Sequence, residues 1–291
     1  MRPLIFLGLA AVLWGVNFHL AKVMVQSSSA IEAGFWRYLF GVSTLSLFTL
    51  GDFPRWTIIK ENIKPLILIG IIGLFAFNYF FFLGLSSTTA VNAALIISLN
   101  PALTLILSHF ILKSAIALNH LIGISLAFFG VLYLIFNGNF LSIKNITISK
   151  GDGWIFMANI VFALHHVWVK KYAGRLTSRH LTFSTNFICL MPFVVVLPIY
   201  NTGNFTLYPR EFWFASIGIG VFGTALSYCL WNIGVAKKGS SQAGIFMNLV
   251  PLSTGVSAFV FGEKVSFIHL ISGILIISGI LFMQKNNRWQ F

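Results

Sequence analysis

Charged residues are scarce in this sequence, and acidic residues are the scarcest of them. Only 9% of the 291 residues are charged, with 6 Asp and Glu against 19 Lys and Arg. A soluble domain carries about 25% charged residues, so this chain cannot cover a water-facing surface of normal size. An intrinsically disordered chain is excluded too, because 57% of the residues are hydrophobic. The composition therefore indicates a protein of the lipid bilayer.

Cysteines and catalytic signatures are also missing or few. The 2 cysteines, Cys189 and Cys229, both lie in apolar runs, so disulfides have no structural role here. The sequence has no H-E-x-x-H motif, no Ser-His-Asp set and no Cys/His metal cluster, so we expect no enzyme, no cofactor and no metal. Its Lys and Arg are scattered through short loops without a long basic run, which speaks against nucleic acid as a partner.

Long apolar runs are what the sequence has instead. A membrane helix needs about 20 mostly apolar residues, and we predict ten of them: Leu4–Val25, Ile31–Leu50, Pro65–Leu85, Thr89–Leu112, Leu118–Asn137, Gly153–Tyr172, His180–Tyr200, Phe212–Ile233, Ser240–Phe261 and Phe267–Gln284. We interpret the first as a retained helix rather than a signal peptide, because no A-x-A cleavage site follows it. No loop between the segments is long enough for a soluble catalytic domain.

The basic residues predict how these helices are oriented. With the N-terminus in the cytoplasm, 13 Lys and Arg fall on the cytoplasmic side and 5 on the outer side. Cytoplasmic loops of membrane proteins carry such an excess. We therefore expect a multi-pass protein of a bacterial inner (plasma) membrane, with the N- and C-termini both cytoplasmic.

The second half of the chain echoes the first. A shift of 150 residues superimposes these pairs: Gly84 on Gly234, Ala93 on Ala243, Leu99 on Leu249, Pro101 on Pro251 and Thr104 on Thr254. We divide the chain into two five-helix repeats, residues 1–140 and 152–285. Because five is odd, the two repeats must insert upside down relative to each other. Inverted repeats around a central cavity are an architecture of secondary transporters, with the binding site near the midplane.

The interior of the predicted helices is neutral and aromatic. Polar side chains in a membrane prefer protein or water to lipid, so we expect a shared chamber between the repeats. Its predicted substrate-binding residues are Trp14, Asn17, Asn78, Phe82, His165, Tyr228, Trp231 and Asn248. For any single Asn, an alternative reading is structural, since Asn commonly joins membrane helices by hydrogen bonds.

Three further kinds of residue stand out within the predicted helices. Pro101 and Pro251 occupy matching mid-span positions and are predicted to kink the helices, either for packing or as gating points. His165 and His166 are the deepest histidines and are candidates for proton coupling. Arg37 lies one or two turns inside the second helix, where three roles are open: snorkelling to the interface, pairing with Glu32, or holding a substrate carboxylate.

Short motifs along the whole chain resemble those of the EamA-type drug/metabolite transporters. They are Leu13-Trp14-Gly15-Val16-Asn17-Phe18, Phe35-Trp36-Arg37-Tyr38, Leu99-Asn100-Pro101, Leu249-Val250-Pro251 and Phe261-Gly262-Glu263. The resemblance implies ten helices, cytoplasmic termini, an inverted repeat around a central cavity, and export or exchange of metabolites such as amino acids. One copy of the last motif is lost, because the first half has Ile111-Leu112-Lys113 at the matching place.

The function we expect is secondary transport by alternating access. The expected cargo is a small neutral or zwitterionic metabolite, an amino acid first, with apolar or aromatic side chains favoured by the Trp, Phe and Tyr residues. One alternative is a carrier for a larger adenine-type or thiamine-like metabolite, and a more distant one is a membrane protein that does not transport, such as an intramembrane enzyme or a sensor. The expected partners are a small-molecule substrate and the lipid bilayer, and we expect a monomer.

Overall fold

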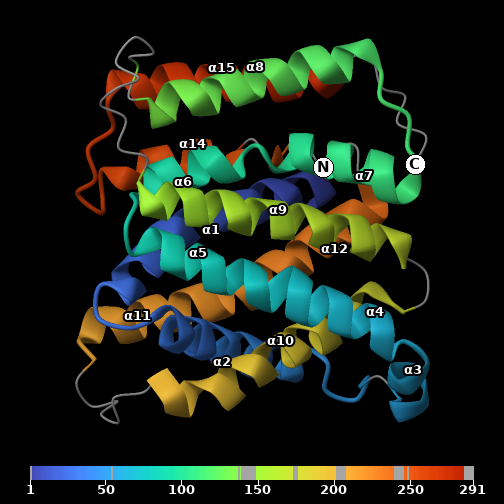
Figure 1. Cartoon of the computed structure of the whole chain (residues 1–291). Coiled ribbons are helices and arrows are strands. Elements are labelled where there is room, and N and C mark those ends of the chain that lie inside the picture. Colours follow the sequence, from blue (N-terminus) through green and yellow to red (C-terminus); the bar gives the residue numbers. More distant parts are fainter. Residues whose placement is uncertain are drawn as a thin grey trace.

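The computed structural model describes residues 2–53, 55–136, 138, 149–172, 176–200, 208–238, 246–247 and 249–284. These residues form helices that run roughly side by side, with no strand among them (Figure 1). The helices are α1 (Arg2–Val25), α2 (Ala30–Phe48), α3 (Trp56–Glu61), α4 (Ile63–Ile67), η1 (Leu68–Ala76), α5 (Phe77–Leu85), α6 (Ala90–Ile97), α7 (Asn100–Leu112), α8 (Leu118–Ile135), α9 (Lys150–Lys171), α10 (Ser178–Tyr200), α11 (Arg210–Gly218), η4 (Ile219–Leu226), α12 (Ser227–Lys238), α14 (Leu249–Ala258) and α15 (Phe267–Gln284).

Apart from α3, which lies in the predicted connection between the second and third segments, the helices fall on the predicted apolar segments, in whole or in part. Five of them are long and apolar enough to cross a membrane: Pro3–Val25, Ile63–Leu85, Ala90–Leu112, Arg179–Ile199 and Arg210–Trp231. Three shorter apolar helices cover Leu118–Leu134, Leu249–Ala258 and Phe267–Phe282. An all-helical, multi-pass membrane protein is therefore confirmed, whereas ten crossings stay a prediction.

The third and eighth predicted helices each contain a π-helical stretch, η1 and η4, which begin 151 residues apart. A π-helix has a wider turn than an α-helix and is rare. Both stretches carry glycines against a neighbouring backbone. A Cβ on Gly70 would lie 3.0 Å from the Thr185 carbonyl oxygen of α10, and one on Gly220 would lie 3.0 Å from that of Arg37 on α2. Glycine thus lets the wide turns pack closely onto α10 and α2.

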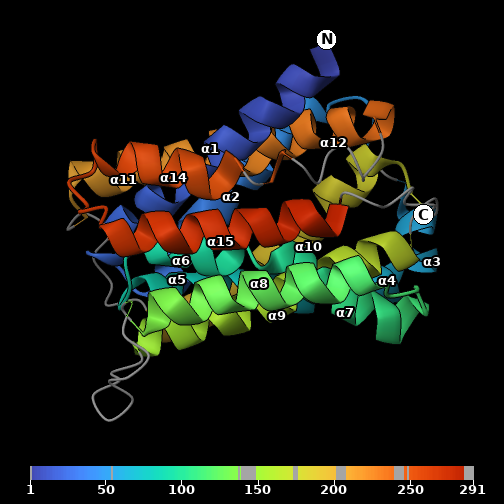
Figure 2. The same cartoon turned by 90° about the horizontal axis from the view of Figure 1, so that it is seen from above.

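The packing partners of the two halves correspond to one another. Helix α1 packs on α11, η4, α12 and α14, while α9 packs on η1, α5, α6 and α7. Helix α2 contacts η4 as α10 contacts η1. Two further pairs join helices at equivalent places of the two halves: α8 with α15 and α2 with α10. In Figure 1, α8 and α15 lie at the top and α2 and α10 at the bottom, and Figure 2 shows α1 beginning and α15 ending toward the same side.

The predicted kink at Pro101 takes a different form in the structure. The chain does not bend one continuous helix there: α6 ends at Ile97, and a new helix, α7, begins at Asn100 with the proline in its first turn. Proline is favoured in a first turn because its missing N–H would have no intrahelical partner there. Pro251 likewise lies in the first turn of α14. The prolines therefore mark helix starts, and a gating role stays a prediction.

Candidate substrate-binding site

Three of the predicted site residues form an aromatic group where α1 crosses α12. The Trp14 ring lies 5.5 Å from that of Tyr228 and 5.1 Å from that of Trp231, measured between centroids. The Trp14 indole Nε1 donates a hydrogen bond of 3.0 Å to the Gly223 carbonyl oxygen in η4. This bond satisfies the only polar group of the indole and fixes its ring. The aromatic group (Trp14, Tyr228 and Trp231) therefore presents a fixed apolar wall inside the protein.

Asn17 joins this region through the same π-helical stretch. It follows Trp14 by three residues, so both lie on one face of α1. Its side chain is buried and fills the space beside Gly223, where a Cβ would overlap the amide. The structure thus brings Asn17 together with the aromatic group, as the sequence predicts.

Asn78 is fully buried and faces α2. Its Nδ2 donates to the Tyr38 hydroxyl at 2.7 Å and to the Leu74 carbonyl oxygen at 2.8 Å. The Tyr38 hydroxyl also contacts the Cys189 thiol of α10. Asn78 therefore joins the third predicted helix to the second, which fits the structural alternative at this position. Its link to the site is the hydrogen bond to Tyr38, the residue after Arg37.

Arg37 extends from α2 toward η4, next to this tyrosine. Its Nε donates to the Thr224 hydroxyl at 3.2 Å, and its guanidinium carbon lies 5.8 Å from the centre of the Tyr38 ring. Thr224 directly follows Gly223, the residue that holds Trp14. Two consecutive residues of η4 therefore bind the Arg37 side chain and Trp14 of the aromatic group, which brings the Arg37 cation close to that group.

Glu32, the acidic residue nearest in sequence to Arg37, is engaged elsewhere. Its carboxylate accepts a hydrogen bond of 2.8 Å from the Ser29 backbone N–H, completing a capping box at the start of α2. It also interacts with the Tyr208 hydroxyl, which lies in the segment before α11. Burial, and then the Glu32 carboxylate, raise the pKa of the Tyr208 phenol, so this group stays protonated and able to donate.

The matching place in the second half holds His165. The residue is buried, and a Cβ on Gly73 of η1 would lie 2.8 Å from its Nδ1, as Gly223 lies against Asn17. Its ring lies 5.7 Å from that of Phe162 and 5.5 Å from that of His166. Each π-helical stretch is thus packed against one polar side chain of the facing helix.

The structure does not bring Phe82 into ring contact with the aromatic group. Phe82 is fully buried and packs 5.6 Å from Phe81, within the hydrophobic core. Pro101 and Pro251 lie at the helix starts described above, and Asn248 lies outside the described residues.

A second polar group closes one end of the molecule. Lys22 Nζ at the end of α1 donates to the Leu85 and Thr88 carbonyl oxygens at 2.6 and 2.7 Å. The Glu263 carboxylate accepts from the Ala90 N–H at 2.7 Å and from the next N–H of α6 at 3.1 Å. The Thr88 hydroxyl donates to the carboxylate of Asp152, which is buried. We call Lys22, Thr88, Asp152 and Glu263 the end network.

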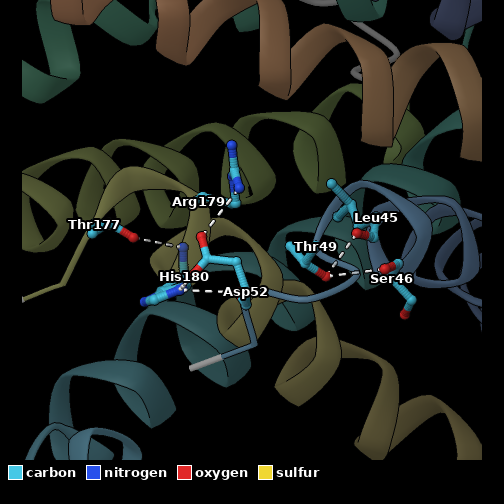
Figure 3. Close-up of polar contacts among 7 residues, drawn as sticks. All are labelled: Leu45, Ser46, Thr49, Asp52, Thr177, Arg179 and His180. Carbon is cyan, nitrogen blue, oxygen red and sulfur yellow. Dashed lines mark hydrogen bonds and ion pairs between the residues drawn. The ribbon is translucent and has the colours of Figure 1, made fainter. Parts of the chain in front are cut away.

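The opposite end of the molecule is joined by an exposed ion pair. Arg179 Nη1 lies 3.1 Å from Asp52 Oδ2, and His180 Nε2 lies 3.2 Å from Asp52 Oδ1 (Figure 3). The arginine and aspartate side chains are 59% and 57% exposed. A pair so exposed contributes little to stability. The two ends therefore differ in how strongly they are closed.

Several residues of this region were not among the predicted substrate-binding residues. For Arg37, holding a substrate carboxylate was only one of three open roles, although it lies inside a predicted helix whereas Lys22, Lys170 and Lys171 lie near the ends of theirs. Thr224 and Tyr38 gave no signal, because hydroxyl side chains are common in membrane helices. Asn159 was missed as well: it accepts from the Asn100 amide at 2.9 Å and donates to the Ile96 carbonyl oxygen at 2.8 Å, bracing the break between α6 and α7.

Comparisons with known proteins agree with this arrangement. The sequence profile of the EamA-like transporter family matches residues 1–136 and again residues 149–284. The uncharacterized transporter YyaM of Bacillus subtilis (strain 168) is 34% identical over 274 residues, covering 93% of this chain and 90% of the relative. An uncharacterized transporter of Methanothermobacter thermautotrophicus is 25% identical over 296 residues, covering 96% and 85%.

One crystal structure supports the fold. It aligns with a TM-score of 0.63 at 18% identity and covers 95% of this chain and 94% of its own. Likeness at that identity concerns the fold alone. The two profile matches and the relatives identify the family, so this chain belongs to the EamA-like transporter family.

Proposed function

We propose that this protein is a secondary transporter that exports or exchanges small neutral or zwitterionic metabolites, amino acids first, by alternating access. The observation that carries the proposal is the aromatic group beside Asn17 and Arg37, where α1 of the first half meets η4 and α12 of the second. Transporter sites lie at such interfaces between repeats. Family membership supports transport, and the aromatic wall supports an apolar substrate side chain.

The proposal includes an inverted repeat of two five-helix units, residues 1–140 and 152–285. Three observations support this repeat: the corresponding packing partners of the two halves, the paired π-helical stretches and the double profile match. Rocking of one unit against the other would then open the site to either side of the membrane in turn, because the outward-open and inward-open states would be built from equivalent contacts. We place the protein in a bacterial inner membrane as a monomer, with both termini in the cytoplasm.

Coupling to protons is proposed to be weak or absent. The described carboxylates lie at helix ends or in connecting segments, whereas proton-coupled transporters carry ionisable groups near the midplane. We therefore propose facilitated exchange or a modest proton dependence. His165 and His166 are the residues to replace by Ala if strong pH-driven accumulation is found.

Counterflow in proteoliposomes tests the function. Purified protein is reconstituted with one unlabelled compound inside, and uptake of the labelled compound is followed. The panel holds the amino acids, an adenine-type compound and thiamine. Uptake of one or more amino acids above empty liposomes supports the proposal, uptake of adenine or thiamine alone supports the alternative cargo, and the absence of counterflow for every compound contradicts it.

A further inference from the structure

Arg37 brings a positive charge into the helix bundle without an acidic partner. The residue is 5% exposed. Among the described residues its guanidinium makes one side-chain hydrogen bond, to Thr224, and no ion pair. A charge at the bilayer centre costs about 2.5–3.5 kcal/mol on insertion scales. Such a residue indicates a functional site. The negative charge that would balance the guanidinium is then expected from a bound molecule.

Glu32 does not fill that place. It precedes Arg37 by five residues on the same helix, about 7.5 Å along the axis. Its carboxylate is already held by the Ser29 N–H and the Tyr208 hydroxyl. The pairing with Glu32 that the sequence left open is therefore absent from the structure.

The donors that Arg37 does not use for Thr224 are not sealed within the helix bundle. Its two terminal nitrogens and the Tyr228 hydroxyl have no hydrogen-bond partner among the described residues. None of them is among the buried polar atoms that lack both solvent contact and a partner. They therefore keep contact with solvent-accessible space. The two side chains lie in one region, because Arg37 bonds to Thr224, the residue after Gly223, which bonds to Trp14, and the Trp14 ring contacts that of Tyr228.

A carboxylate matches this pair of donors. The planar guanidinium offers two parallel N–H groups that bind both oxygens of a carboxylate, and a tyrosine hydroxyl supplies a further donor. The Tyr228 ring belongs to the aromatic group, so an apolar side chain attached to that carboxylate would lie against Trp14 and Trp231. The single positive charge of Arg37 would balance the single negative charge of such a carboxylate.

We propose that Arg37 binds the carboxylate of the transported compound, with Tyr228 as the second donor. The substrates are then small carboxylates with an apolar side chain, such as apolar amino acids, and organic cations are excluded. This assignment rests on the proposed transport function and adds the recognition element to it.

Ligand-dependent thermal stability tests the assignment. Purified protein in detergent is heated with each amino acid, and then with matched compounds that share one side chain: L-phenylalanine, its amide, phenethylamine and 3-phenylpropionate, and the corresponding leucine set. The variants are Arg37→Gln, Arg37→Lys and, as the matched control, Arg179→Gln, which removes an exposed arginine. Counterflow of every compound that stabilises the wild type is measured in parallel.

We expect carboxylates to stabilise the wild type and the Arg179→Gln control, and the amides and amines to have no effect. Arg37→Gln should bind the same carboxylates at least thirtyfold more weakly, about 2 kcal/mol, and Arg37→Lys should keep part of the affinity. Equal stabilisation of Arg37→Gln, or a wild type stabilised by amides or amines or by no carboxylate, overturns the assignment. Counterflow of compounds without a carboxylate would then leave the transport function standing, whereas no counterflow at all would remove both.

Discussion

The two parts of the Trp14 side chain have different roles in the proposed site. Its indole N–H is bonded to the Gly223 carbonyl oxygen, so the ring cannot turn freely. An unpaired donor in the same place would cost about 1–3 kcal/mol. The ring is therefore positioned before any substrate arrives, and Tyr228 and Trp231 pack against it. A preorganised wall loses little side-chain entropy on binding.

Trp231→Ala is expected to weaken substrate binding while the protein stays folded. The variant removes one ring of the aromatic group, which lies at the interface between α1 and α12. We expect the apparent affinity in counterflow to fall about tenfold, corresponding to about 1.4 kcal/mol. Trp154→Ala is the control, because that residue is 38% exposed and stacks on Phe80 outside the site. Equal losses in the two variants would contradict a binding role for Trp231.

The site could be predicted in part because helical spacing identifies faces. Trp14 and Asn17 share a face, and repeat matching links Tyr228 and Trp231 to the third helix, so these four emerge from the sequence. Asn78 was placed in the chamber, yet it bonds to Tyr38. Spacing says which side of a helix is polar but not which neighbour it meets, and that depends on how the helices are rotated in the bundle.

At the scale of helices, the two π-helical stretches determine how the bundle packs. Each widens the helix where glycines meet a polar side chain: Asn17 at Gly223 and His165 at Gly73. The wide turn also leaves the Thr224 hydroxyl bonded to the Ile219 carbonyl oxygen five residues back, at 3.2 Å. The proposed substrate site and the helix geometry thus depend on the same few residues.

Gly223→Ala is expected to destabilise the protein because its Cβ would overlap the Asn17 amide. Overpacking of this kind costs about 1–3 kcal/mol, so we expect a lower melting temperature in detergent. Gly153→Ala in α9 is the matched control. A Cβ there meets nothing within 4 Å, and replacing a helical glycine by alanine stabilises by about 0.5–1 kcal/mol. A Gly223→Ala protein that melts at the wild-type temperature would contradict the close packing.

Neither the π-helical stretches nor the helix break before Pro101 could be located from the sequence. The periodicity of apolar residues identifies a helix, but it does not distinguish a π-helical turn from an α-helical one. Proline signals a disturbance, but whether the chain kinks or restarts depends on partners such as Asn159, which holds the Ile96 carbonyl oxygen from another helix. These features depend on contacts between helices distant in sequence.

At the scale of the molecule, the two ends are closed to different degrees. The end network combines a lysine, two carboxylates and several backbone groups, partly buried, whereas Asp52 and Arg179 at the other end are exposed. In the proposed orientation the end network lies on the outer side. Alternating access then requires these bonds to break when the outer side opens.

Glu263→Gln is expected to ease that opening. The variant removes a negative charge from the first turn of α6, where a carboxylate contributes about 0.3–1 kcal/mol and up to about 2 when partly buried. We expect a membrane-impermeant maleimide added outside to label Val91→Cys at least threefold faster in a background with Cys189→Ala and Cys229→Ala. Asp52→Asn is the control and should leave the labelling rate unchanged. An unchanged rate in Glu263→Gln would show that the network does not limit opening.

A reporter fused after Phe291 tests the proposed orientation. With 13 Lys and Arg on the cytoplasmic side against 5 outside, we expect the fusion to read as cytoplasmic. A fusion after Gly51, between α2 and α3, should read the same way. A C-terminus on the outer side would contradict both the orientation and the even number of crossings.

The paired π-helical stretches also bear on the history of the chain. A π-helical turn holds more residues than an α-helical turn and is rare. Here it occurs in η1 and η4, which begin 151 residues apart, at Leu68 and Ile219, and each falls within one of the two segments matched by the family profile. If the two halves are repeats, as we propose, a single origin of the π-helical stretch in a shared ancestor requires fewer events than two separate origins. The stretch would then be older than the duplication, at a time when the ancestral gene encoded a single half and two copies of its product had to assemble to build one site.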